Sequence, residues 1–140
     1  MAIQGEPSLE SSGVRDTPGR RRTVLIVEDD RDMLDALAAL LDESGYAVLR
    51  ARNGVEALLR LETEAATCDL ILLDLMMPVM NGWDFRRKQL QMPAIAGIPV
   101  LLMSAGAHLA TATGDLGAAG YLAKPVETTD LLEVVRQHVS

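Results

Sequence analysis

A short apolar run that ends in an acid constrains the fold of this chain most. Residues 70–73 are all leucine or isoleucine, and Asp74 follows them directly. So short an apolar run between polar residues predicts a strand that is buried on both faces. Met-Met-Pro at 76–78 and Asn-Gly at 81–82 then require turns rather than an immediate helix. Because ligands of open α/β sheets bind outside the carboxyl ends of the strands, Asp74 is placed for chemistry if the sheet is parallel. The alternative is a strand-end Asp that only caps a loop.

Strand-like and helix-like segments alternate along the rest of the chain. Alternation at this spacing predicts right-handed crossovers and a parallel sheet with helices on both faces. We therefore predict an α/β fold with a five-stranded, doubly wound parallel sheet of flavodoxin-like order 2-1-3-4-5 and five helices. The expected strands are at 24–27, 47–49, 70–73, 98–103 and 121–123. The expected helices are at 33–41, stopped by Gly45, at 53–64 with Asn53 and Glu56 as a capping pair, at 83–90, as a short or frayed turn within 105–119, and at 131–139.

The length and composition indicate one globular domain. The chain has 140 residues, enough for a single core, and we expect that domain at 23–140 after a disordered leader at 1–22. A net charge of −7 argues against a direct nucleic-acid surface. The lone cysteine, Cys68, is expected to pack in the core of a protein from a reducing compartment. Without a membrane-length apolar run or a signal peptide, the chain is expected to be cytoplasmic and not inserted in a membrane.

Two groups of basic residues have no obvious chemical role. Arg20–Arg22 end the leader and could touch a phosphate or an acidic partner, but a solvated flank is the favoured interpretation. Arg86, Arg87 and Lys88 fall within the expected third helix, where we predict that they form its solvated side.

Polar side chains stand where the expected strands end. Glu28 and Asp29 follow the first strand, Asp74 the third, Ser104 the fourth and Lys124 the fifth. The predicted strand order brings all five to one edge of the sheet. Three neighbouring carboxylates repel one another, and a hard divalent cation such as Mg²⁺ relieves that repulsion. Together with an ammonium and a hydroxyl, the set suits a phosphoryl group, with a carboxylate as its acceptor.

Four short motifs together resemble the receiver domain of two-component response regulators. They read Val-Leu-Ile-Val-Glu-Asp-Asp at 24–30, Asp-Leu-Met-Met-Pro-Val-Met-Asn-Gly at 74–82, Met-Ser-Ala at 103–105 and Gly-Tyr-Leu-Ala-Lys-Pro at 120–125. The similarity covers about residues 23–138 and is to the stand-alone, chemotaxis-type receiver.

The resemblance implies a role for each site residue. Asp74 would accept the phosphoryl group from a sensor histidine kinase or phosphotransfer protein, and Lys124 and Ser104 would contact it. Tyr121 would be a switch that turns inward as Ser104 moves. The Mg²⁺ ligands would be Glu28, Asp29, Asp74 and the backbone carbonyl of Met76.

Departures from the family pattern lead to two expectations. The segment from Ser104 to Lys124 is about two residues short, and residues 105–123 hold no Lys or Arg and one acid, Asp115. Because residues 105–123 have no Lys or Arg, we expect no dimer held together by ion pairs on the face that these residues form. Met76 and Gly106 cannot hydrogen-bond an attacking water through their side chains, so slow self-dephosphorylation is expected.

Since no output module follows the last predicted helix, the preferred interpretation is a stand-alone receiver that signals through contacts with an unknown downstream protein, or a phosphate shuttle. It would catalyse only its own phosphoryl transfer and dephosphorylation. A pseudo-receiver docking module that is not phosphorylated is the main alternative. A fragment of a larger regulator is also open, whereas Met76 argues against a haloacid-dehalogenase-type phosphatase.

Overall fold

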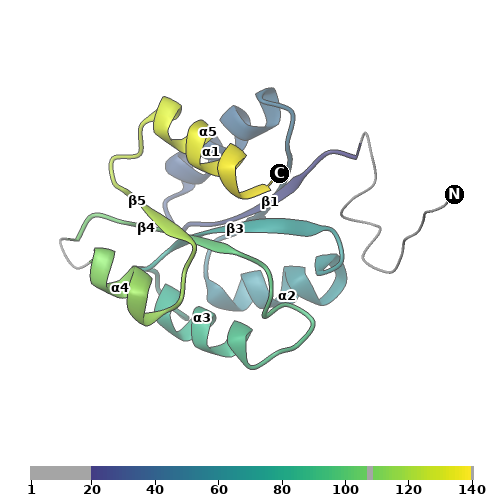
Figure 1. Ribbon diagram of the computed structural model, residues 1–140, viewed down its shortest axis with the longest axis vertical. Helices are drawn as coiled ribbons and strands as arrows, with labels where there is room; N and C mark the ends of the chain where they lie inside the picture. The colour runs from purple at the N-terminus through teal and green to yellow at the C-terminus, as the bar shows by residue number, and fades with distance from the viewer. Residues whose placement is uncertain (1–19, 107–108, 140) are drawn as a thin grey trace, which may run out of the picture.

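The computed structural model describes residues 20–106 and 109–139, and these residues form a five-stranded parallel sheet in the order β2-β1-β3-β4-β5 (Figure 1). The predicted fold class and strand order are confirmed. The elements are β1 (Thr23–Val27), α1 (Arg31–Glu43), β2 (Ala47–Ala51), α2 (Gly54–Glu64), β3 (Cys68–Asp74), α3 (Gly82–Leu90), β4 (Val100–Ser104), α4 (Leu109–Asp115), β5 (Gly120–Ala123) and α5 (Thr128–Val139).

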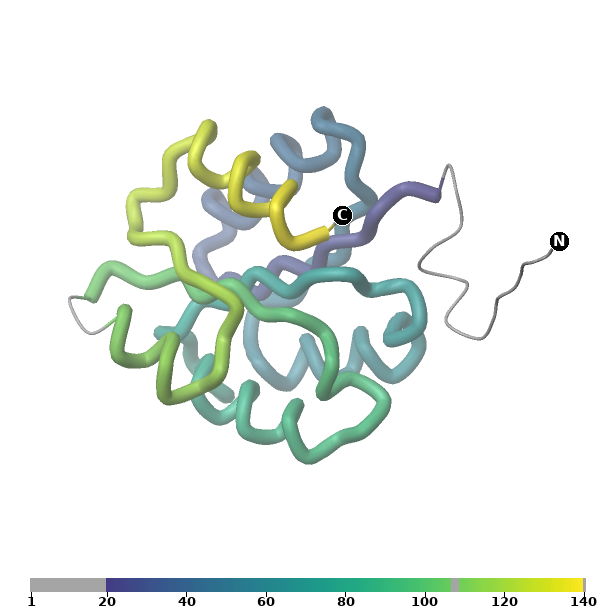
Figure 2. Tube along the Cα trace, viewed as in Figure 1, coloured from purple at the N-terminus to yellow at the C-terminus, as the bar shows by residue number. Residues whose placement is uncertain are grey.

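Two layers of helices cover the sheet. The chain trace in Figure 2 shows α1 and α5 on one face and α2, α3 and α4 on the other. The central strand β3 is buried along its whole length, as its apolar run predicts. Its side chains alternate, with Leu70 and Leu72 packing under α1 and α5, and Ile71 and Leu73 packing under α2, α3 and α4. This rigid double core fixes the carboxyl end of β3, where Asp74 lies.

Side-chain caps set where the first three helices begin. The carboxylate of Asp30 accepts from the amide of Met33 at 3.1 Å, and Asn53 accepts from the amide of Glu56 at 2.9 Å. Glu56 in turn accepts from the amide of Arg52 at 2.8 Å, so the predicted capping pair is present. Asn81 caps α3 in the same way. These caps hold the loops after β1, β2 and β3 in place at one edge of the sheet.

The helix α1 ends at the predicted glycine. Gly45 has a φ of +99°, its amide donates to Asp42 O at 3.1 Å, and the amide of Tyr46 donates to Leu41 O at 3.0 Å. This pattern is a Schellman motif, which needs a left-handed residue at the position of Gly45.

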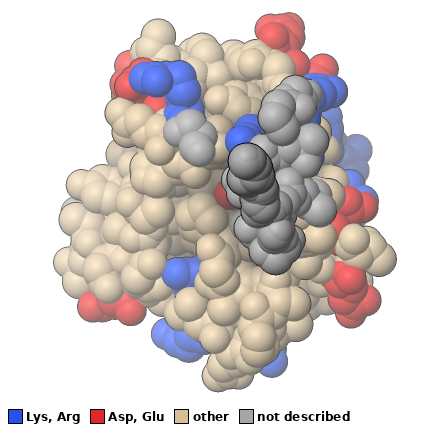
Figure 3. Space-filling model, turned by 45° about the vertical axis from the view of Figure 1, so that its right-hand side comes forward, with Lys and Arg blue, Asp and Glu red and all other residues tan. Residues whose placement is uncertain are grey.

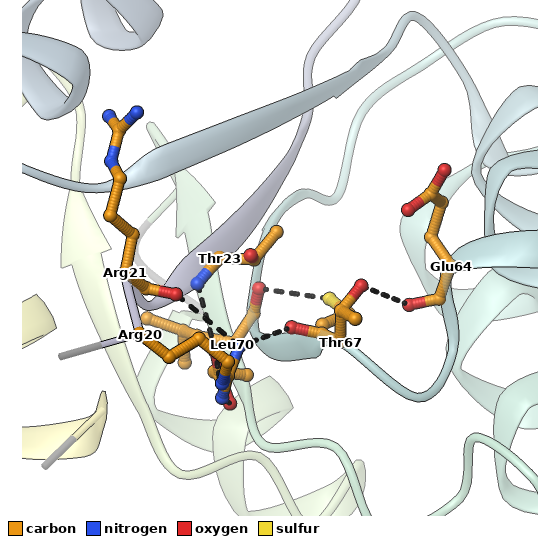
Figure 4. Close-up of polar contacts among 8 residues, drawn as sticks. Arg20, Arg21, Thr23, Glu64, Thr67 and Leu70 are labelled. Carbon is orange, nitrogen blue, oxygen red and sulfur yellow. Dashed lines mark hydrogen bonds and ion pairs between the residues drawn. The ribbon is translucent and has the colours of Figure 1, made fainter. Parts of the chain in front are cut away.

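Arg20 is not part of a solvated flank. Its guanidinium binds both carboxylate oxygens of Asp69, at 2.9 and 3.1 Å, and Asp69 also accepts from the amide of Thr23 at 2.8 Å. The side chain of Arg20 is 17% exposed, whereas that of Arg21 is 55% exposed. Figure 4 shows Arg20, Thr23 and Thr67 gathered where β1 and β3 begin. The solvated interpretation is therefore wrong for Arg20, and the rest of the expected leader, 1–19, lies outside the described residues.

Arg86 also differs from its prediction. Arg87 and Lys88 are exposed, but Arg86 turns inward and is 6% exposed. It donates to backbone carbonyls at the end of α4, thirty residues further along the chain. Helical periodicity alone could not reveal so distant a partner.

No helix in the described part of the chain has the length and apolar character needed to cross a membrane.

Candidate functional site

The predicted strand-end residues meet at the carboxyl edge of the sheet. Glu28 and Asp29 follow β1, Asp74 ends β3, Ser104 ends β4, and Lys124 follows β5. The register places Asp74 beside Met103 and Ser104 beside Ala123, so the ends of β3, β4 and β5 lie level with one another. The parallel sheet thus brings residues almost a hundred positions apart to one place.

Three carboxylates form the centre of the site. One oxygen from each of Glu28, Asp29 and Asp74 lies within 4.8 Å of the others. Glu28 is fully buried and Asp74 is 2% exposed, whereas Asp29 is open to solvent. The cluster therefore has a buried floor and one accessible side, through which a small ligand could enter.

Lys124 binds the two buried carboxylates. Its Nζ lies 2.8 Å from Glu28 Oε1 and 3.4 Å from Asp74 Oδ2. The other oxygens accept from backbone amides: Glu28 Oε2 from Asp30 N at 3.1 Å and Asp74 Oδ1 from Met76 N at 3.2 Å. Asp74 is thus oriented by fixed donors on both of its oxygens, as a positioned nucleophile requires.

Burial dominates the electrostatics of the site. The pKa of Asp74 is raised to about 7, mainly by burial and next by the negative charge of Glu28, against the opposing effects of Lys124 and of the amide of Met76. Burial also opposes the charge of Lys124, but contacts with Glu28 and Asp74 outweigh it and raise the pKa of that ammonium. One ammonium does not balance three carboxylates, so the site retains an excess of negative charge.

The donor set fits a hard divalent cation. Three carboxylates with oxygen atoms this close, two of them buried, match the oxygen ligands and small coordination shell of Mg²⁺. A bound dication would supply the positive charge that Lys124 alone does not. The backbone carbonyl of Met76 stays a predicted fourth ligand.

Ser104 and Tyr121 occupy neighbouring strands. Ser104 is 2% exposed, and its Oγ accepts a long 3.4 Å hydrogen bond from Gly106 N. The side chain of Tyr121 is 46% exposed on β5, next to Leu102 of β4. Their roles as phosphoryl contact and switch stay predictions.

Two glycines, Gly82 and Gly54, hold the loop that follows Asp74. A Cβ at Gly82 would lie 2.6 Å from the carbonyl oxygen of Asp74, and a Cβ at Gly54 would lie 2.6 Å from Cγ of Met80. Gly54 N also donates to Met80 O at 2.9 Å. The sequence analysis did not identify Gly54, because its contact joins α2 to a loop more than twenty residues away.

The loop after Asp74 carries an apolar rim. Val79 is 82% exposed and has a φ of 69°, an unfavourable conformation for a β-branched residue. Met76 is 63% exposed and lines a hollow of about 350 Å³. The hollow is completed by Met77, Pro78, Asn81 and Trp83. Figure 3 brings forward the right-hand side of Figure 1, away from this loop, and shows acidic and basic side chains in separate groups among uncharged residues.

Comparison with known proteins shows which family the chain is similar to. Residues 24–136 match the model of the response regulator receiver domain family. The chain is 38% identical over 115 residues to the transcriptional regulatory protein CpxR of Klebsiella pneumoniae, covering 81% of this chain and 47% of CpxR. It is 35% identical over 116 residues to the sensory transduction protein RegX3 of Mycobacterium tuberculosis, covering 81% of this chain and 49% of RegX3. The chain thus spans about half the length of these curated relatives.

Solved structures agree with this match. The chemotaxis response regulator CheY4 of Vibrio cholerae superposes with a TM-score of 0.78 at 27% identity, over 86% of this chain and all of CheY4. The non-phosphorylated HemR receiver domain of Leptospira biflexa gives a TM-score of 0.75 at 29% identity, over 86% of this chain and 95% of that domain.

Proposed function

This chain belongs to the response regulator receiver domain family of two-component systems, and on that premise we propose that Asp74 accepts a phosphoryl group in a Mg²⁺-dependent reaction. The donor would be a sensor histidine kinase or a phosphotransfer protein. The observation that supports the proposal most is the position of Asp74. It lies at the open edge of the sheet, oriented by Lys124 and the amide of Met76, beside two further carboxylates.

Each residue of the site contributes to an in-line transfer. An oxygen of Asp74 attacks phosphorus, the bond from phosphorus to the donor's imidazole nitrogen breaks, and the imidazole leaves. Lys124 neutralises charge on the phosphoryl oxygens, which is the main requirement of phosphoryl transfer. Glu28, Asp29, Asp74 and the carbonyl of Met76 would hold Mg²⁺, which supplies the remaining positive charge.

The phosphorylated state would then signal through protein contacts. Ser104 would donate its hydroxyl to a phosphoryl oxygen, and Tyr121 would turn inward from its half-exposed position. We place the output surface around Tyr121 and the helices beside it, where an unknown downstream protein would bind. We place this function in the cytoplasm, because the free thiol of Cys68 is typical of a protein from a reducing compartment. The absence of an ion-pair dimer and the slow loss of the phosphoryl group stay predictions.

Intact-mass spectrometry after incubation with acetyl phosphate and Mg²⁺ tests the acceptor. We expect one added phosphoryl group on the wild type and none on Asp74→Asn or in the presence of EDTA. A folded wild type that binds Mg²⁺ but gains no phosphoryl group would contradict the proposal and favour a pseudo-receiver that docks without phosphorylation. An adduct that persists on Asp74→Asn would place the acceptor elsewhere.

A further inference from the structure

Arg86 is a buried cation without a buried anion beside it. It is 6% exposed, and within the described residues no carboxylate forms an ion pair with it. Burial lowers its pKa, but a guanidinium stays charged in proteins. A buried charge is costly unless other polar groups compensate it. The groups that surround Arg86 therefore show what its charge stabilises.

Backbone carbonyls at the end of α4 provide that compensation. Arg86 Nε donates to Leu116 O at 3.0 Å, and Nη2 donates to Gly117 O at 2.9 Å. The remaining arm, Nη1, donates to Gln89 Oε1 at 2.7 Å. Gln89 is fully buried, and its Nε2 donates to Ile95 O at 2.9 Å and Ile98 O at 3.0 Å. The two side chains thus join α3 to the end of α4 and to the loop before β4.

The helix α4 needs such help at its carboxyl end. It has seven residues, Leu109–Asp115, too few for stability by local hydrogen bonds alone. Its last turn holds no basic residue, and Asp115 places a negative charge where the helix dipole is already negative. The left-handed Gly117, with a φ of +62°, then ends the turn. The guanidinium of Arg86 supplies the missing cation from a neighbouring helix.

The opposite end of α3 is fixed to the phosphoacceptor loop. Gly82 N donates to Leu75 O at 3.0 Å, and Gly82 packs directly on the carbonyl of Asp74. The helix α3 is therefore attached at one end beside Asp74 and, through Arg86, to the carboxyl end of α4. At the amino end of α4, Leu109 N donates to Gly106 O at 3.4 Å, and Gly106 N donates to Ser104 Oγ at 3.4 Å.

We infer that Arg86 caps α4 from outside the helix and makes its carboxyl end a fixed pivot, so that a change at Ser104 swings the amino end of α4. The capping role follows from the hydrogen bonds of Arg86 in the unphosphorylated protein and does not depend on phosphorylation. The pivot rests on the proposed function, because it needs an event at Asp74 that moves Ser104. Arg86 is thus a positioning residue for the response and takes no part in the chemistry.

Amide hydrogen exchange of the unphosphorylated protein tests the cap. Arg86→Met is compared with Arg87→Met, a change in the adjacent residue, whose side chain is 61% exposed. We expect the amides of Leu116–Ala119 to exchange about tenfold faster in Arg86→Met than in Arg87→Met, with little change in α1 and α5. Equal rates in the two variants would overturn the cap. An equal rise in every helix would also overturn it, because it would mean general destabilisation.

The pivot is tested on the wild type, which avoids any folding defect. Beryllium fluoride with Mg²⁺ serves as the phosphoryl mimic on Asp74. We expect exchange to change by about threefold or more at Ser104–Gly106 and at the amino end of α4, and by less than about twofold at Leu116–Ala119. In Arg86→Met, the change in amide exchange caused by the phosphoryl mimic should extend to Leu116–Ala119. Equal changes at both ends of the wild-type helix would overturn the pivot.

The two proposals fail in different ways. If the mimic changes exchange nowhere around Asp74, the phosphoacceptor function and the pivot both fail, while the comparison of the unphosphorylated variants still decides the cap. If the mimic binds but both ends of α4 respond alike, the phosphoacceptor stands and only the pivot is overturned.

Discussion

At the scale of single residues, Asp74 shows how a folded protein can tolerate an unfavourable group at a reactive position. Its carboxyl is buried beside Glu28, and the pKa of about 7 means that folding without metal takes up a proton between about pH 4 and pH 7. The folded pKa lies above the unfolded one, so this stabilising proton is held at low pH and lost as the pH rises through 7. The metal-free site therefore destabilises the fold at neutral and higher pH.

Replacing Asp74 by Asn should stabilise the protein in EDTA, and more so at high pH. The gap in unfolding free energy between Asp74→Asn and wild type should widen by about 1–2 kcal/mol from about pH 5.5 to about pH 8, after allowance for solvent screening. Urea unfolding at the two pH values measures it. Excess Mg²⁺ should narrow the gap by binding only the wild type. A gap that does not depend on pH would show that Asp74 titrates normally.

At the scale of elements, the loop between β3 and α3 is held by close backbone approaches. A methyl group at Gly82 would lie 2.6 Å from Asp74 O and 2.8 Å from Leu75 Cα, and neither backbone atom can move without shifting the site. Gly114, in α4, offers a contrast, because a Cβ there meets nothing within 4 Å.

Gly82→Ala and Gly114→Ala should therefore have opposite effects. We expect Gly82→Ala to lower the unfolding free energy by about 1–3 kcal/mol through overpacking. Gly114→Ala should raise it by up to about 1 kcal/mol, because alanine favours a helix over glycine. Chemical denaturation of both variants measures the difference. A neutral Gly82→Ala would mean that the loop relaxes freely.

How well the sequence predicted these features depended on how far apart in the chain the interacting residues lie. The strand order, the caps at Asn53 and Gly45 and the edge that gathers Glu28 and Asp74 follow from local pattern and from the handedness of crossovers. The burial of Arg86 did not follow, because its partners, the carbonyls of Leu116 and Gly117, lie in the turn after α4, thirty residues or more along the chain, and carry no side-chain signal. For the same reason, periodicity could not pair Arg20 with Asp69 across forty-nine positions.

At the scale of the whole molecule, the ion pair of Arg20 with Asp69 bears on where the domain begins. Asp69 is 8% exposed and accepts from both Arg20 and the amide of Thr23, so it ties the start of β1 to the start of β3. This tie lies at the amino edge of the sheet, away from Asp74. Arg20 therefore packs against the domain that we predict from residue 23 onward.

Substitutions at the amino end of the domain should show that Arg20 contributes more to stability than Arg21. Arg20→Met should lower the unfolding free energy by about 1–3 kcal/mol, because it leaves a buried carboxylate without its cation. Arg21→Met loses an exposed ion pair with Asp42 and exposed hydrogen bonds to the carbonyls of Gly45 and Tyr46, and it should cost less than about 1 kcal/mol. Removal of residues 1–19 should leave stability unchanged if they form the expected leader. Thermal or urea unfolding measures these changes in stability. Equal losses of unfolding free energy in the two arginine variants would count against a structural role for the ion pair of Arg20 with Asp69.

The hollow in the loop that follows Asp74 has a practical consequence. Trp83 is the single tryptophan of the chain, and it lines this hollow next to Met76 and Met77, on the first turn of α3. Indole emission responds to the polarity and the quenching groups around it. The protein thus carries one built-in fluorophore on the helix that follows the loop after Asp74. We expect its emission to report rearrangements of that loop in a cuvette, in real time and on the unlabelled chain.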